Sequence, residues 1–180
     1  FNWKLKQLAL SPSDFLLYPE SCYTAEFLRA YNEDEIVVFD TETTGLNVFT
    51  DDIIEVAAIR IKGGEVVGEP LDLYIETDKP ILPKLGDKEN PMYAIYHEKL
   101  ATGELLPPAD ALQRFLAYVG TSPILGHNAN YDYNILDNNL QRYCNDTMQA
   151  HPIRCFDSLK DYWLRAFILT SWKVCSKPST

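Results

Sequence analysis

The chain has 180 residues, and its 46% apolar and 23% charged residues are the composition of a globular domain with a hydrophobic core. A formal net charge of −10 excludes binding of nucleic acid through a broad basic face, although contact with a few nucleotides through metal ions is compatible with it. No apolar run is long enough to cross a bilayer, and the 4 cysteines lack CxxC spacing, so a cytoplasmic protein with reduced thiols and no membrane partner is expected.

The first residues differ in pattern from those that follow. Residues 1–34 are interpreted as an N-terminal extension that contains one short helix over 21–31. From Glu35 the pattern changes to a continuous apolar run, Ile36 to Phe39, which ends at Asp40. Such a run predicts a buried central strand and the start of the main domain.

A three-stranded meander is predicted from this strand onward. Residues 53–61 are mostly apolar and predict a second strand, and Gly63-Gly64 predicts a hairpin turn into a third strand over 65–76. Gly68 and Pro70 are expected to interrupt the third strand. Strands joined by such short turns pair in antiparallel fashion.

The remainder of the chain alternates helices with short strands. Residues 79–91 are rich in proline and predict a loop. Helices are predicted over 92–101, 109–119 and 132–143, short strands over 123–126 and 153–156, and a further helix that Asp157 or Ser158 would cap. This order predicts an α/β domain with a mixed sheet, in which the meander continues into parallel strands flanked by helices.

Two acidic residues lie where the first strand is expected to end. Asp40 and Glu42 are two positions apart, so in an extended chain their carboxylates point to the same side. Such a pair repels unless a cation lies between them, and hard divalent cations prefer oxygen ligands. Asp132 starts a later helix and is expected to bring a third carboxylate to the same edge of the sheet. The three residues predict a magnesium or manganese site.

Two segments give this site a family resemblance. The segment from Asp40 to Leu46, DTETTGL, resembles the first motif of the DEDD (DnaQ-like) 3′–5′ exonuclease superfamily, and the segment from His127 to Asp132, HNANYD, resembles the second. The resemblance is greatest to the proofreading exonuclease subunit of bacterial DNA polymerase III and covers a domain over 35–165. It implies a ribonuclease-H-like fold.

The resemblance also implies a function. The chain would be a metal-dependent exonuclease that acts on single-stranded 3′ ends, with DNA favoured over RNA. Asp40, Glu42 and Asp132 would be catalytic and would hold two ions, Mg²⁺ or Mn²⁺. Substrate would be bound by residues of both motifs: Thr41, Thr43, Thr44, Leu46 and Asn128. Whether a polymerase or a helicase is a further partner is left open.

The third motif of the superfamily, a histidine followed five residues later by an aspartate, is not found. None of His97, His127 and His151 fits it. We therefore expect a C-terminally truncated form of the fold with weak binding of the second ion and impaired activity, because a general base contributes roughly 10²–10⁴-fold. Residues 166–180 are interpreted as an irregular tail, which a frameshift in the coding sequence would explain.

Other polar residues have structural explanations. His127 is expected to orient its loop, Asp157 to cap a helix, and the Asp51-Asp52 pair to stabilise a turn, whereas Glu55 is given no role. The alternative to an enzyme is an inactive nucleic-acid-binding or protein-interaction module on the same fold. Thermal stabilisation by Mn²⁺ would distinguish a working metal site from a vestigial one.

Overall fold

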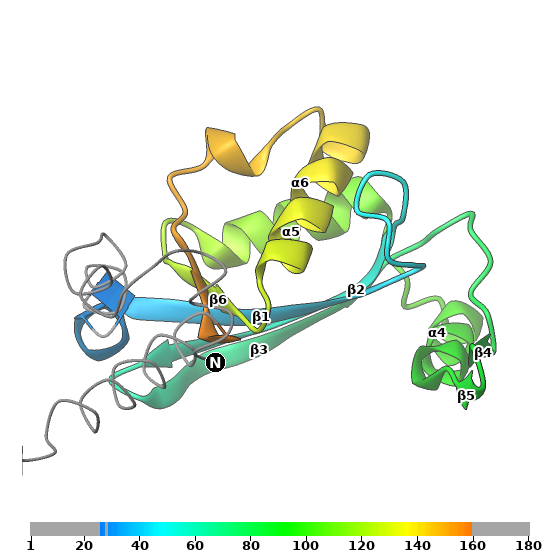
Figure 1. Cartoon of the computed structure of the whole chain (residues 1–180), viewed down its shortest axis with the longest axis horizontal. Coiled ribbons are helices and arrows are strands. Elements are labelled where there is room, and N and C mark those ends of the chain that lie inside the picture. The colour runs from blue at the N-terminus through cyan, green and yellow to red at the C-terminus, as the bar shows by residue number, and fades with distance from the viewer. Residues whose placement is uncertain (1–25, 28, 160–180) are drawn as a thin grey trace, which may run out of the picture.

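A five-stranded mixed sheet organises the part of the chain that the computed structural model describes, residues 26–27 and 29–159 (Figure 1). Its strands lie in the order β3 (Glu65–Tyr74), β2 (Ile53–Lys62), β1 (Glu35–Thr43), β6 (Ile124–Gly126) and β7 (Cys155–Asp157). β3, β2 and β1 pair in antiparallel fashion, whereas β6 and β7 continue the sheet in parallel. The predicted α/β class, with a meander followed by parallel strands, is confirmed.

Two glycines turn β2 into β3 as the sequence predicts. Gly63 and Gly64 have φ angles of 58° and 84°, the left-handed conformation that both central residues of a tight hairpin turn require. β3 is continuous, but three of its residues, 68–70, lie opposite one residue of β2, where the register shifts between Ala58 and Arg60. The predicted interruption is therefore present as a bulge and not as a break.

β1 is longer than the sequence predicts. Its pairing with β2 runs from Glu35 to Thr43, with a shift of register only at the last pair. Asp40 and Glu42 consequently lie within the last four residues of the strand, near the end where the sequence places them. The apolar run stops at Phe39, but hydrogen bonds to β2 keep the polar residues beyond it extended.

Two helices, α5 (Pro108–Val119) and α6 (Asn130–Cys144), cover one face of the sheet (Figure 1). Their apolar sides form the main core with β1, β2 and β6, and Phe115 of α5 lies 5.7 Å from Phe39 between ring centroids. The helices bury Leu112, Phe115, Ile135, Leu136 and Leu140. Each such side chain contributes about 1.5–3 kcal/mol when it is fully buried. The core therefore fixes α6, which carries Asp132, against β1.

A smaller unit lies at one end of the sheet (Figure 1). It consists of α4 (Pro91–Thr102) and a hairpin of β4 (Lys84–Leu85) and β5 (Lys88–Glu89). Asn90 caps α4 by accepting a hydrogen bond from the amide of Met92, which packs with Tyr96 against Ile54. The helix agrees with the prediction, but the hairpin falls in the predicted loop, because strands of two residues carry no periodic pattern.

The predicted N-terminal helix is only in part accessible to comparison. Residues 26, 27 and 29–33 are helical, and Ala30 packs with Ile36 and Phe156. Residues 1–25 and 160–180, including the predicted tail at 166–180, lie outside the described residues. No helix in the described ranges is long and apolar enough to cross a membrane.

Gly126 sets how closely β6 approaches α6. A Cβ atom added at this glycine would lie 2.9 Å from the Cβ of Ala129 and 3.3 Å from its Cα, so the backbone itself would have to move. We expect Gly126→Ala to destabilise the chain by about 1–3 kcal/mol, the usual cost of overpacking. Urea unfolding of the parent and of Gly126→Ala would measure this cost as a lower midpoint. An unchanged midpoint for Gly126→Ala would contradict the close packing.

Candidate active site

The pleat of β1 separates its acidic residues from the residue between them. Asp40 and Glu42 are exposed on one face of the strand, whereas Thr41 is 8% exposed and points to the other face, beneath the helices. The sequence prediction that the two carboxylates share one side is therefore in accord with the structure.

The third carboxylate belongs to the first turn of α6 and is held by Thr41. Asp132 is 5% exposed, and its Oδ1 accepts a hydrogen bond of 2.6 Å from the Thr41 hydroxyl. Burial raises the pKa of Asp132, the Thr41 hydrogen bond opposes that shift, and the nearby Asp40 charge adds to it, with a net increase. Thr41 thus joins the two motifs through its side chain.

The three carboxylates influence one another's ionisation. Partial desolvation raises the pKa of Glu42, and the charges of Asp40 and Asp132 raise it further. The neighbours that act most strongly on Glu42 and Asp132 include no basic side chain. An uncompensated set of oxygen ligands of this kind suits a hard divalent cation.

The side chains are nevertheless not gathered into a chelate. Among the described residues, no group of three or more His, Cys, Asp or Glu side chains is arranged to hold a metal ion. Asp40 and Glu42 lie on the exposed face of β1, whereas Asp132 contacts Thr41 on the buried face. The donor chemistry fits a cation, and the assignment of Asp40, Glu42 and Asp132 as its ligands stays a prediction.

Of the predicted substrate residues of the first motif, Thr41 and Thr43 lie in β1, and Thr44 and Leu46 lie in the turn that follows it. The Thr43 hydroxyl donates to the carbonyl of Gly45 at 2.8 Å, and the Tyr131 hydroxyl of α6 lies 2.8 Å from both Thr43 Oγ1 and the Gly45 oxygen. Leu46 is 88% exposed. The turn is therefore fixed to α6 while its apolar side chain stays accessible.

The second motif is held by the last residue of β7 and by the residues that follow it. The amide of Asn128, a residue with a φ of 60°, donates to Asp157 Oδ1 at 3.0 Å. The same Asp157 oxygen accepts from the amide of Leu159 at 2.9 Å, so the predicted cap is confirmed. His127 Nδ1 lies 3.0 Å from the Ser158 hydroxyl, which agrees with its predicted role in orienting the loop.

Glu55 has surroundings that the sequence did not indicate. It pairs with Glu42 across β1 and β2 and with Tyr74 across β2 and β3. Burial raises its pKa to about 7, with further contributions from the charge and hydrogen bond of Asp72 and from Glu42. Only the strand register, which joins residues from three strands, could reveal this cluster.

The raised pKa of Glu55 predicts a pH-dependent stability. The folded state keeps this proton until the pH reaches about 7, whereas the unfolded chain releases it near 4.5, so stability falls as pH rises between these values. We expect Glu55→Gln to raise the melting temperature at pH 8 by about 2–4 °C, equivalent to about 1 kcal/mol in a domain of this size. At pH 5 the two proteins should melt alike. Equal shifts at both pH values, or the same shift in the exposed variant Glu98→Gln, would contradict this explanation.

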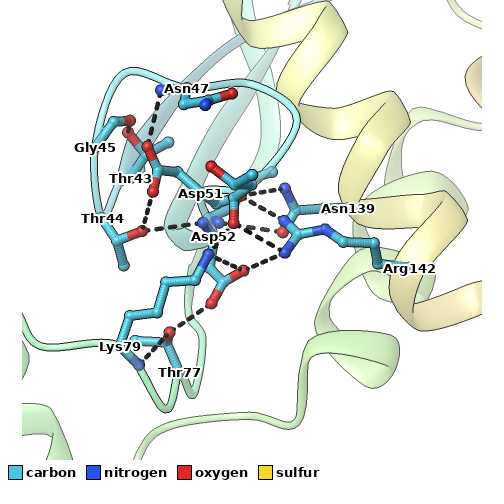
Figure 2. A network of polar contacts seen from close by, with 12 residues as sticks. Thr43, Thr44, Gly45, Asn47, Asp51, Asp52, Thr77, Lys79, Asn139 and Arg142 are labelled. Atoms are coloured by element: carbon cyan, nitrogen blue, oxygen red, sulfur yellow. Dashed lines mark hydrogen bonds and ion pairs between the residues drawn. The ribbon is translucent and has the colours of Figure 1, made fainter.

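The Asp51-Asp52 pair performs two different tasks (Figure 2). Asp51 stabilises the turn as predicted, because its Oδ2 accepts from the amide of Asn47 at 2.8 Å. Asp52 closes the turn through its backbone, which exchanges hydrogen bonds with Thr44, but its side chain has a role that the sequence did not indicate: it is 4% exposed and is the centre of an ion-pair network. Its carboxylate is contacted by Thr77, Lys79, Arg142 and Tyr143. These partners are distant in sequence, so the residues of the turn alone do not indicate the network.

Solved structures with a similar fold define the class of the domain. Exonuclease I of E. coli in complex with a dT13 oligonucleotide has a TM-score of 0.51 at 23% identity, over 68% of this chain and 27% of that one. An exonuclease I from Methylocaldum szegediense has a TM-score of 0.50 at 19% identity, over 68% and 27% of the two chains. The described domain has the ribonuclease-H-like fold of these proteins, as predicted.

The sequence places the chain in a family. Residues 37–165 match the family model RNase_T, described as exonuclease, and the chain belongs to this family. The PolC-type DNA polymerase III of Thermotoga maritima is 35% identical over 106 residues, 59% of this chain and 7% of that protein. Its counterpart in Oceanobacillus iheyensis is 33% identical over 122 residues, 63% and 8% respectively. The chain thus spans less than a tenth of these relatives, and the predicted resemblance to exonucleases of bacterial DNA polymerase III is confirmed.

Proposed function

We propose that the chain is a metal-dependent 3′–5′ exonuclease that hydrolyses phosphodiester bonds at single-stranded ends, with DNA as the favoured substrate. The observation that carries this proposal is the arrangement of three mutually repelling carboxylates across β1 and α6. Asp40 and Glu42 share the exposed face of one strand, Thr41 between them binds Asp132 of α6 on the buried face, and the charges of the three carboxylates act on one another. Membership of the exonuclease family supports the same conclusion.

The side chains would divide the work as follows. Asp40, Glu42 and Asp132 would hold Mg²⁺ or Mn²⁺, each as an ionised carboxylate. When bound, such ions lower the pKa of water and neutralise the charge that develops on the attacking and leaving oxygens. Thr41 keeps Asp132 in place through its hydroxyl hydrogen bond of 2.6 Å, which favours the ionised form.

Substrate binding would rely on the turn after β1 and the loop after β6. Thr43 and Thr44 place hydroxyls and backbone groups beside the strand end, and Leu46 offers an exposed apolar side chain for the terminal base. Asn128, in the loop after β6, would contact the nucleic acid strand from the other side. With a net charge of −10, the protein would gain little from phosphate contacts, so stacking and metal-mediated contacts would dominate.

The relatives suggest the source of the 3′ ends. They are PolC-type DNA polymerases, and the exonuclease-like segment is one part of each. We therefore propose a polymerase as the partner that supplies DNA ends to this domain. Neither a helicase partner nor an RNA substrate has comparable support.

The decisive experiment is a cleavage assay with the full chain. A 5′-labelled single-stranded oligonucleotide, as DNA and as RNA, is incubated with Mg²⁺ or Mn²⁺ and with EDTA. We expect a ladder of products that shortens from the 3′ end and disappears with EDTA. Cleavage should be faster with DNA than with RNA. Binding without cleavage in either metal would favour the inactive nucleic-acid-binding module instead, and cleavage within the strand would exclude an exonuclease.

A further inference from the structure

The turn between β1 and β2 is held by more contacts than a surface connection requires. The Thr44 amide donates to the carbonyl of Asp52 at 2.9 Å, and the Asp52 amide donates back to the Thr44 hydroxyl at 3.0 Å. Asp51 accepts from the amide of Asn47, and a Cβ added at Gly45 would lie 2.5 Å from Asp51 Oδ2. Residues 44–51 therefore form a tightly closed loop, which we call the motif loop.

The Asp52 side chain is the point from which this loop is held (Figure 2). Its Oδ1 accepts from Arg142 at 2.7 Å, from Tyr143 at 3.0 Å and from Lys79 at 3.1 Å, and its Oδ2 accepts from Thr77 at 2.7 Å. Arg142 and Lys79 also donate to the carbonyl of Thr50 within the loop. The same two cations thus bind both the buried carboxylate and the loop backbone.

The network joins the motif loop to α6 at a second place. At the first turn of α6, the Tyr131 hydroxyl donates to the Gly45 carbonyl. Near its last turn, Arg142 reaches Asp52, and Asn139, 2% exposed, donates to the Asp51 carbonyl at 3.2 Å. Two attachments fix both the position and the direction of a helix relative to a loop, whereas one would leave it free to pivot. The two attachments thereby fix the position of Asp132 relative to the motif loop.

Stability alone does not explain a buried acid with two cationic partners. Ionised groups lose hydration on burial, and well-packed apolar residues often serve stability as well or better. Such a network fixes the orientation of the groups that it joins, because each hydrogen bond forms only within a narrow range of distances and angles. In the Asp52 network every donor comes from outside the motif loop: Thr77, Lys79, Arg142 and Tyr143.

We propose that Asp52 is a positioning residue for substrate binding: through Arg142 and Lys79 it holds the motif loop, with Thr44 and Leu46, in register with Asp132 on α6. This inference rests on the proposed exonuclease function. Asp40 and Glu42 lie on β1, which pairs with β2 from Glu35 to Thr43, and neither side chain belongs to the network. Loss of the network should therefore weaken substrate binding more than the chemical step.

The test compares two variants of the full chain with a matched control. Asp52→Asn keeps the shape but removes the charge, and Arg142→Met keeps much of the aliphatic volume. The control Asp146→Asn removes another carboxylate contact beside α6, the 2.8 Å pair with His151, which does not touch the motif loop. Cleavage of the labelled DNA gives kcat and KM, and hydrogen exchange of the Thr44 and Asn47 amides reports the loop without any need for activity.

We expect kcat/KM to fall about 10- to 100-fold in Asp52→Asn and Arg142→Met, the scale of a displacement of about 1 Å, mainly through KM. Exchange at Thr44 and Asn47 should accelerate in both, and the double variant should be no worse than the more impaired single variant. Asp146→Asn should match the parent. If Asp52→Asn is unfolded at the assay temperature, Lys79→Met removes one partner only and takes its place.

Three results would overturn the proposal. The first is parent-like exchange at Thr44 and Asn47 in both network variants, and the second is an equal loss of kcat/KM in Asp146→Asn. The third is a fall in kcat with unchanged KM, which would contradict a role in substrate positioning. If the parent chain itself does not cleave, the exonuclease function fails. The exchange measurement then still decides whether Asp52 holds the motif loop.

Discussion

Asp40→Asn should lower the rate of 3′-end cleavage by about 10²–10⁴-fold, because loss of a ligand removes several kcal/mol of metal-based stabilisation and each 1.4 kcal/mol is tenfold. The same change should leave the melting temperature in EDTA unchanged or higher. Asp40 is exposed, and its charge raises the pKa values of Glu42 and Asp132, so its removal relieves repulsion. Opposite effects on activity and stability are typical of functional carboxylates.

Cleavage assays and thermal melts on the same preparation would measure both effects. Asp87→Asn, an exposed aspartate between β4 and β5, is the matched control and should alter neither. Mn²⁺ should raise the melting temperature of the parent and of the control but not of Asp40→Asn. If Asp40→Asn loses cleavage and its melting temperature in EDTA also falls, Asp40 supports the fold and not the chemistry.

The sheet could be predicted because its signals are local. The apolar run before Asp40 predicts β1, and the mostly apolar residues 53–61 predict β2. Each prediction needs only the residues of one short segment. Gly63-Gly64 specifies its turn because only such residues accept two successive positive φ angles. The helices α5 and α6 follow from apolar spacing in the same way. Strand order then follows from short connections and pairing rules.

Of the candidate site, only the part that lies within one strand could be predicted in the same way. Alternation along β1 placed Asp40 and Glu42 together, but no local pattern records that Thr41 donates to Asp132, 91 positions away. The register of three strands, which surrounds Glu55 with Glu42 and Tyr74, is another property of the assembled sheet. Sequence motifs identified the ligand candidates, whereas the contacts that set their ionisation emerge only from tertiary packing.

Asp52 is the plainest case of this limit. In the sequence it is the second of two adjacent acidic residues in a turn, a pattern that indicates exposure. In the fold it is the more buried of the two, because β2 begins at the next residue and draws it under α6. Its four side-chain partners lie 25 to 91 positions away. A residue with so many distant contacts should be sensitive to substitution.

Asp52→Ala is accordingly expected to reduce the free energy of unfolding at pH 7 by about 3 kcal/mol, near the lower end of values for a broken buried ion pair. The lower end applies because Lys79 and Arg142 keep 34% and 31% of their side chains exposed and regain water. Thr77 and Tyr143 would lose their common acceptor. Urea unfolding measures this cost, and Asp146→Asn, which breaks an exposed pair, should cost clearly less.

The pH dependence of this difference identifies its cause. Burial by itself would raise the pKa of Asp52, but hydrogen bonds from Thr77, Lys79, Arg142 and Tyr143 outweigh it and hold the pKa below 3.8. An acid with a depressed folded pKa contributes stability that is complete above its unfolded value and is lost as pH falls through the folded one. The gap between parent and Asp52→Ala should therefore be constant from pH 8 to pH 5 and narrow only below 3.8. A gap that is the same at pH 3 as at pH 7 would show that Asp52 acts through packing and not through its charge.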